Sequence, residues 1–202
     1  MKKLLVTGFD PFAHYQLNPS WEAVKLLPDT VRDFVVTKLL LPNIFGLAGR
    51  MLLEKAAQVQ PDVILLTGMD SGSRYVHMDT VAVNVRDALI EDNLGRKPWN
   101  EVISEDGPTA YFSTLPVHEL VRRLRESNYP VQLGYTTGGY VCNEIFYTAC
   151  RHFAGSNTKV GFVHVPLMPE MVWEESLALP VEKSAQLLQI IIDTLAQMLE
   201  EK

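Results

Sequence analysis

Short apolar runs of strand length alternate with longer segments of helical periodicity from one end of the chain to the other. The strand-like runs are residues 4–6, 34–41, 63–67, 131–133 and 160–165, and the helical segments are residues 19–27, 44–59, 117–126, 142–153 and 181–200. The run 63–67 has no polar alternation, which is typical of a strand covered on both faces. The pattern therefore predicts the α/β class, as a three-layer α/β/α sandwich with a mainly parallel central sheet.

Turn and cap residues mark the ends of several elements. Asn18-Pro19-Ser20 places a capping side chain and a first-turn proline at the start of one helix, and Gln60-Pro61-Asp62 stops another. Residues 68–116 are irregular and contain one clear strand, residues 80–84. A long loop-rich stretch inside a compact domain predicts a binding site in that region.

Length and charge narrow the class of protein. The 202 residues favour a single domain over residues 1–202. The 24 acidic and 18 basic side chains give a net charge of −6, which provides no general attraction to phosphate backbones. The first apolar run ends at Thr7-Gly8, too early for a signal peptide, and no stretch approaches the roughly 20 apolar residues of a membrane span. We therefore expect a cytoplasmic protein that binds neither nucleic acid nor membrane.

The stretch Gly138-Gly139-Tyr140-Val141-Cys142-Asn143 is the most informative for chemistry. Paired glycines after a strand let the chain turn sharply, and Cys142 then stands where a helix begins. There the helix dipole favours a thiolate, and unpaired backbone N–H groups can stabilise an oxyanion. The alternative is a small buried apolar residue, which we expect for Cys150. Cys150 lies about 12 Å further along the same helix, too far for a disulfide.

A cysteine nucleophile needs a base that can also protonate the leaving amine, and histidine does this near neutral pH. His164 ends a strand and so faces the same loop layer as Cys142, although a histidine hydrogen-bonded within the core is an alternative. His118 and His152 lie on predicted helices, and His14 lies in a loop. A carboxylate should orient the imidazole. The irregular region offers Asp70, Asp79, Asp87 and Asp92.

Seven further segments follow one another in order along nearly the whole chain. They are Thr7-Gly8-Phe9-Asp10-Pro11-Phe12, Asn18-Pro19-Ser20-Trp21-Glu22-Ala23-Val24, Val81-Ala82-Val83-Asn84, Asp106-Gly107-Pro108, Ala110-Tyr111-Phe112-Ser113-Thr114-Leu115-Pro116, Val141-Cys142-Asn143 and Gly161-Phe162-Val163-His164-Val165-Pro166. In these segments the chain resembles the pyroglutamyl peptidase I (pyrrolidone-carboxylate peptidase) family of cysteine peptidases.

The resemblance implies a cytosolic hydrolase that removes N-terminal pyroglutamate from peptides, needs no cofactor, folds as an α/β/α sandwich and assembles as a homodimer or homotetramer. It implies that Cys142 is the nucleophile and His164 the base. Asp79 stands where the family has a catalytic glutamate. The resemblance also places four side chains at the pyroglutamyl ring: Phe9, Phe12, Ile90 and Tyr140.

Several positions depart from the family pattern. Asp79 is one methylene shorter than the family's glutamate, so it reaches the imidazole only if the backbone comes closer. Leu89 replaces an arginine that helps to form the oxyanion site, and Tyr140 replaces a phenylalanine. Ala13-His14 replaces a pair of glycines, and Met69 stands in place of a glutamine. The Tyr140 hydroxyl must find a partner if it is buried and can alter what the pocket accepts.

Three hypotheses follow. The first is hydrolysis of a pyroglutamyl or related small lactam amide by Cys142, His164 and Asp79. The second is a degenerate relative that binds a ligand or partner without catalysis, as the changes at Asp79 and Leu89 suggest. The third is a metal hydrolase that uses His77, Asp79 and His14, since His77 and Asp79 would share one face of a strand.

Overall fold

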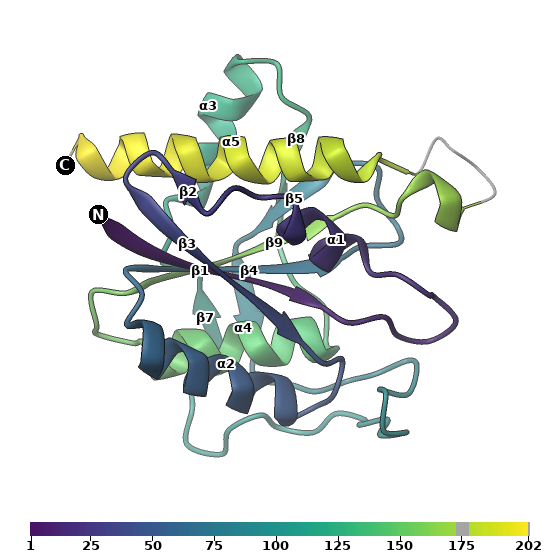
Figure 1. The fold of residues 1–202 in the computed structure, drawn as a ribbon. Coiled ribbons are helices and arrows are strands. Elements are labelled where there is room, and N and C mark those ends of the chain that lie inside the picture. The colour runs from purple at the N-terminus through teal and green to yellow at the C-terminus, as the bar shows by residue number, and fades with distance from the viewer. Residues whose placement is uncertain (173–177, 202) are drawn as a thin grey trace.

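A seven-stranded sheet runs through the middle of the protein in the order β2-β3-β1-β4-β9-β5-β8 (Figure 1). The computed structural model describes residues 1–172 and 178–201. The strands of this sheet are β1 (Lys2–Phe9), β2 (Thr30–Val31), β3 (Phe34–Leu41), β4 (Val63–Met69), β5 (Val76–Asp79), β8 (Val131–Gly134) and β9 (Lys159–Val165).

Most neighbouring strands of this sheet are parallel, as the sequence predicts. β3, β1, β4 and β9 all run in one direction, so their carboxyl ends meet at one edge. β5 reverses the direction, because it pairs with β9 in antiparallel fashion and with β8 in parallel fashion. The short strand β2 is also antiparallel to its neighbour β3.

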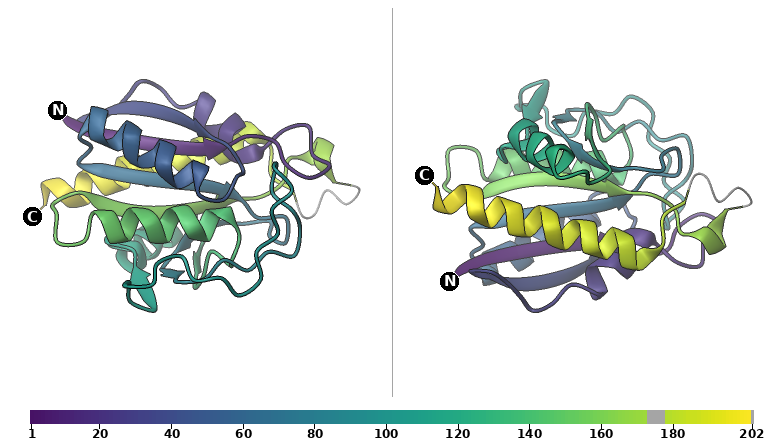
Figure 2. Two further views of the ribbon diagram at one scale, coloured as in Figure 1. Left: turned by 90° about the horizontal axis from the view of Figure 1, so that it is seen from below. Right: turned by 90° about the horizontal axis from the view of Figure 1, so that it is seen from above.

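Helices cover both faces of the sheet, which confirms the predicted three-layer sandwich (Figures 1 and 2). One face packs against α1 (Pro19–Lys25), α3 (Val117–Glu126) and α5 (Val181–Glu200). The other face packs against α2 (Leu47–Val59) and α4 (Val141–His152). A short 3₁₀ helix, η1 (Pro169–Met171), follows β9. Each face of the sheet therefore has its own apolar core.

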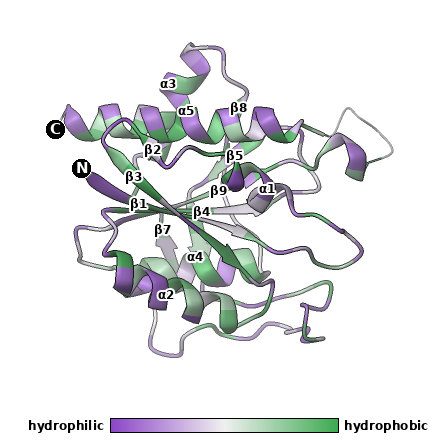
Figure 3. Cartoon of the chain, viewed as in Figure 1, coloured by the Kyte–Doolittle hydropathy of each residue, from purple (hydrophilic) through white to green (hydrophobic). Residues whose placement is uncertain are grey.

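The longest helix, α5, shows why helical periodicity predicts its position well. Hydrophobic and hydrophilic bands alternate along it (Figure 3), and its buried positions include Leu188, Ile191, Ile192 and Leu195. Such spacing gives an apolar stripe that faces the sheet and a polar face that meets water. Among the described helices, none is both long enough and apolar enough to cross a membrane.

The irregular region holds more strand than the sequence predicts. The strand expected at residues 80–84 is shorter, β6 (Val81–Val83), and it pairs with an unpredicted strand, β7 (Ala110–Phe112), in a separate two-stranded sheet. β5 was also not predicted. Each of these strands has three or four residues, too few for a readable alternation.

The helix predicted to begin at Ile44 begins at Leu47 instead. Gly46 precedes it with a backbone φ of 78°, a left-handed conformation that an α-helix cannot contain. The sequence pattern of Ile44 and Phe45 looks helical, but their backbone belongs to the turn after β3. This prediction was wrong by three residues for that reason.

Gly8 allows the close approach of α1 to β1. A Cβ atom at Gly8 would lie 2.6 Å from the Cα atom and 2.7 Å from the backbone nitrogen of Trp21, so it would collide with the backbone of α1. The hydroxyl of Ser20 also accepts a hydrogen bond of 3.0 Å from the Phe9 backbone N–H. This junction ties the start of α1 to the end of β1, beside the edge where the parallel strands end.

We expect Gly8→Ala to lower the free energy of unfolding by about 1–3 kcal/mol, because helix and strand must move apart to admit a methyl group. The measurement is urea denaturation followed by circular dichroism. Gly49→Ala is the matched control, since its nearest neighbour would be a Thr148 methyl at 3.4 Å and alanine favours a helix. Equal midpoints for Gly8→Ala and the unmodified protein would contradict this view of the junction.

Candidate active site

Cys142 lies in the first turn of α4, and Asn143 holds that turn in place. The Asn143 side chain accepts a 2.9 Å hydrogen bond from Val83 N–H and donates to the carbonyls of Val83 and Val85 at 2.9 and 2.8 Å. The Thr137 hydroxyl donates to the same amide oxygen at 3.2 Å. These bonds fix the start of α4 against β6, so the position of Cys142 is set by a fully buried amide.

Gly68 lets the sulfur of Cys142 rest directly on the sheet. A Cβ atom at Gly68 would stand 2.7 Å from the Cys142 Sγ and 2.9 Å from the Phe162 ring, so any side chain there would displace the thiol. Gly68 on β4 is also the register partner of His164 on β9. The sulfur and the imidazole therefore approach the sheet at neighbouring positions, and both side chains are buried.

Asp79 reaches His164 in spite of its short side chain. Asp79 Oδ2 lies 2.6 Å from His164 Nδ1. β5 runs beside β9 with Asp79 opposite Phe162, two residues before His164, so both side chains point from the same face. On the other side, a Cβ atom at Gly134 would lie 1.9 Å from Asp79 Oδ1. The missing side chain of Gly134 makes room for the carboxylate.

The charge state of His164 is set by opposing effects. Burial disfavours the charged imidazolium, but the Asp79 carboxylate and the hydrogen bond and charge of Cys142 outweigh burial and raise the pKa of His164 to about 10. Because Nδ1 faces Asp79, Nε2 is the ring nitrogen left for Cys142. The three groups form a connected cysteine–imidazole–carboxylate series.

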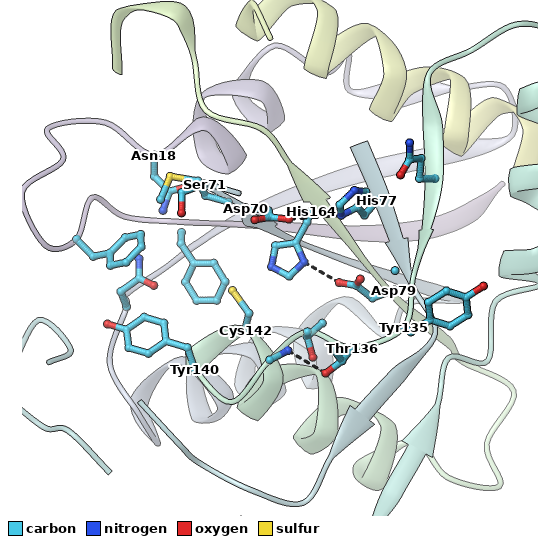
Figure 4. A pocket seen from close by; sticks show the side chains of 18 of the residues that line it. Asn18, Asp70, Ser71, His77, Asp79, Tyr135, Thr136, Tyr140, Cys142 and His164 are labelled. Carbon is cyan, nitrogen blue, oxygen red and sulfur yellow. Dashed lines mark hydrogen bonds and ion pairs between the residues drawn. The ribbon is translucent and has the colours of Figure 1, made fainter. Parts of the chain in front are cut away.

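The series opens into a pocket of about 550 Å³ (Figure 4). Phe9, Phe12 and Tyr140 are among the residues that line it, and Tyr140 lies on the other side of Cys142 from Asp79 in Figure 4. The Tyr140 ring lies 5.7 Å from Phe12 and meets Phe45 edge-on at 5.3 Å between ring centroids. The extra hydroxyl of Tyr140 donates to the Glu91 carbonyl at 3.1 Å, so it is satisfied. This side is suited to a small flat ring.

Two buried amides that the sequence did not predict as site residues, Asn18 and Asn43, also line this pocket. Asn18 caps α1 and donates to the Asp10 carbonyl at 2.9 Å, and Asn43 donates to the same carbonyl at 2.7 Å. Asn43 lies two residues after the end of the strand 34–41, so the rule that parallel strands end at one edge was a usable signal for it. These amides add hydrogen-bonding capacity beside the aromatic rings.

The structure leaves two positions named from the family pattern outside the pocket. Ile90 is 44% exposed and Leu89 is 84% exposed, and neither is among the residues that line it. Both lie in a loop whose backbone is turned by Asp92, which accepts bonds from the backbone N–H groups of Phe45, Leu94 and Arg96. The prediction that Ile90 lines the pocket was therefore wrong, since its side chain is partly exposed to solvent.

The remaining titratable candidates take other positions. His77 and Asp70 line the pocket, and His77 Nδ1 lies 3.4 Å from Asp70 Oδ2. His14 stacks on Tyr15 at 4.1 Å. Within the described residues, no group of three His, Cys, Asp or Glu side chains could hold a metal ion. The metal hypothesis therefore lacks a third ligand beside His77 and Asp79.

Comparison with known proteins finds relatives over nearly the whole chain. The family model described as pyroglutamyl peptidase matches residues 2–198. A pyrrolidone-carboxylate peptidase from Finegoldia magna is 38% identical over 201 residues, which are 98% of this chain and 90% of that protein. A second, from Thermococcus onnurineus, is 38% identical and spans 95% of this chain and 98% of that protein.

Solved structures agree as well. The crystal structure of Bacillus amyloliquefaciens pyroglutamyl peptidase I superimposes with a TM-score of 0.92, at 34% identity and 98% coverage of both chains. Pyrrolidone carboxyl peptidase from Thermococcus litoralis gives a TM-score of 0.93 at 28% identity, over 100% of this chain and 96% of that one. The chain belongs to the pyroglutamyl peptidase family.

Proposed function

We propose that this protein is a cysteine peptidase that removes an N-terminal pyroglutamyl group, or a closely related small lactam acyl group, from peptides or amides. The observation that carries the proposal is the buried contact series from Asp79 through His164 to Cys142, at the floor of a pocket with an aromatic side. No feature of the site favours the degenerate alternative, since each of the three groups has its partner.

The proposed reaction has two stages. Cys142 Sγ attacks the scissile carbonyl carbon, and the carbonyl oxygen becomes an oxyanion beside the backbone N–H groups at the start of α4. His164 then gives a proton to the leaving nitrogen as the C–N bond breaks, which leaves a thioester on Cys142. Water attacks the thioester, His164 takes its proton, the C–S bond breaks, and the free acid departs with Cys142 and His164 returned to their starting state. Asp79 holds the imidazole in orientation throughout.

Backbone groups are the proposed source of oxyanion stabilisation. The family's arginine is replaced by Leu89, which is exposed and outside the pocket lining. The Tyr140 side chain at the N-cap makes no capping hydrogen bond in the described structure, so the first N–H groups of α4 keep their capacity to donate. A single such donor typically supplies about 2.7–4 kcal/mol of transition-state stabilisation.

The proposed acyl pocket consists of Phe9, Phe12 and Tyr140. Phe9 is buried, Phe12 is half-buried, and Tyr140 closes the side between them and Phe45. Flat faces and edges of aromatic rings suit a five-membered lactam, whose amide can bond to Asn18 or Asn43. Ile90 is not part of this proposed pocket, since it does not line it.

We also propose that the protein works in the cytoplasm as a homodimer or homotetramer. Cys142 and Cys150 are both free thiols, which suits a reducing compartment. Large exposed apolar side chains concentrate in residues 89–112, where Leu89, Leu94, Trp99 and Phe112 are between 74% and 84% exposed. Exposed apolar surface of this kind is typical of an interface between copies of a chain.

We expect light scattering to give a mass in solution of two or four times the chain mass of 22.7 kDa. Trp99→Glu should lower that mass, because it places a charge among apolar side chains that are buried in the oligomer. Leu26→Glu is the control, since Leu26 is 54% exposed on a different part of the chain. A monomeric mass for the unmodified protein would overturn the oligomer.

We expect Cys142→Ala to lower kcat for a pyroglutamyl reporter amide by at least about a thousandfold, because the nucleophile is removed. Cys150→Ala is the matched control and should stay active. Iodoacetamide near neutral pH should alkylate Cys142 and leave Cys150 unmodified, since burial raises the pKa of the Cys150 thiol to about 12. Full activity of Cys142→Ala would refute the assignment, and inert Cys142 without any turnover would favour the degenerate alternative.

We expect Asp79→Asn to reduce kcat by about 10²- to 10⁴-fold, because the amide cannot stabilise the imidazolium. Without the carboxylate, its charge and hydrogen bond no longer oppose burial and the pKa of His164 falls, so a smaller fraction of the ring is charged at pH 7 than in the unmodified protein. Nitrogen-15 NMR of the histidine rings measures this change, with His164→Gln to assign the signal. An imidazolium fraction at pH 7 that is unchanged in Asp79→Asn would contradict the proposed role.

Gly134→Ala provides a second test of the same role. The new methyl group would occupy the position of Asp79 Oδ1 and push the carboxylate away from His164. Its kcat should therefore fall in the same direction as that of Asp79→Asn, although residue 79 is unchanged.

A further inference from the structure

A second carboxylate, Asp70, stands at the catalytic pocket beside His164. Asp70 directly follows β4, and its backbone N–H donates to the Val165 carbonyl at 2.9 Å, one residue beyond His164. It lines the pocket, and 34% of its side chain is exposed (Figure 4). None of the steps proposed above uses this carboxylate.

The surroundings of Asp70 fix its position and favour its charged form. The His77 hydrogen bond, the 2.8 Å bond from Gly72 N–H, and the nearby imidazoles of His164 and His77 together outweigh burial and lower the pKa of Asp70. His77 is itself held, with Nε2 2.9 Å from the Ser73 hydroxyl. The carboxylate is therefore an oriented anion at neutral pH.

Asp70 lies near His164 at the pocket (Figure 4). The leaving nitrogen takes its proton from His164, so the departing peptide must lie on the His164 side of Cys142, away from the aromatic rings. His77, the partner of Asp70, is the register partner of His164 on the neighbouring strand. Asp70 and His77 thus border the space that receives the first residue of the leaving peptide.

No lysine or arginine among the described residues lines this pocket to offset the anion. Arg74 belongs to the same loop, but its guanidinium donates to the Tyr75 hydroxyl at 2.8 Å and lies over the Tyr75 ring at 5.0 Å. The His164 imidazolium is paired with Asp79 at 2.6 Å, so this side of the pocket keeps the negative charge of Asp70. A cationic side chain is attracted to such a site and an anionic one is repelled.

We propose that Asp70 is a specificity-determining residue that selects pyroglutamyl peptides whose next residue is cationic, such as lysine or arginine, over those whose next residue is acidic. This inference rests on the proposed pyroglutamyl peptidase activity and names the preferred leaving group of that site.

The test compares kcat/KM for three amides: pyroglutamyl-lysine amide, pyroglutamyl-norleucine amide and pyroglutamyl-glutamate amide. Norleucine has the four-carbon side chain of lysine without the charged amine. We expect lysine to exceed norleucine by about fivefold and glutamate to fall below norleucine, as for a partly exposed charge pair. The ratio should shrink at about 1 M salt, where the screening length is about 3 Å.

Asp70→Asn should bring the lysine-to-norleucine ratio close to one. We use the ratio as the readout because a general effect of the substitution on His164 would change kcat/KM for all three amides by the same factor. Asp29→Asn is the matched control: it removes the same charge from a side chain that is 94% exposed before β2, at the opposite edge of the sheet, and should leave the ratio unchanged.

The remaining outcomes separate a failure of this inference from a failure of the proposed function. Turnover of all three amides at equal rates, or a preference that survives in Asp70→Asn, would overturn this proposal and leave the proposed function standing. If none of the three amides is hydrolysed, the proposed function is refuted, and this inference is refuted with it.

Discussion

The site depends on the close approach of the start of α4 to Gly68, a position in the sheet that has no side chain. Gly68 leaves the space in which the Cys142 sulfur sits, and the next strand presents His164 at the same level of the sheet. Asn143 keeps α4 at that distance by bonding to the backbone of Val83 and Val85. Gly68 and Asn143 together place the sulfur beside both the positive end of the α4 dipole and the imidazole of His164.

The shorter acidic residue is accommodated by strand direction and by a second glycine. β5 runs antiparallel to β9, which brings the backbone of Asp79 alongside the strand that carries His164. Gly134, on the far side, leaves the carboxylate the room it needs. The shorter aspartate looks unfavourable in the sequence alone, but in the folded chain Asp79 Oδ2 lies 2.6 Å from His164 Nδ1.

The sequence predicts those helices whose bounds are set by local periodicity and by the residues at their ends. α3 and α5 have the expected bounds because their periodicity and flanking residues agree, and α4 begins at Val141, one residue before the predicted start at Cys142. The contact between Asp79 and His164 is different, because it depends on the direction of a four-residue strand that no periodicity reveals. The family resemblance pointed to this pair, but only the three-dimensional pairing of β5 with β9 explains its reach. The position of Ile90 outside the pocket likewise depends on a loop turned by long-range bonds to Asp92.

The carboxylates of Asp79 and Asp70 both lie near the imidazole of His164, but they affect it differently. Asp79 contacts Nδ1 directly and stabilises the imidazolium, and Asp70 acts on the same ring only through space. A negative charge near the pocket also opposes an oxyanion, so Asp70 carries an electrostatic cost for catalysis unless it has another role. A cationic leaving group would offset that cost, which is why we connect Asp70 with the choice of substrate and not with the chemical step.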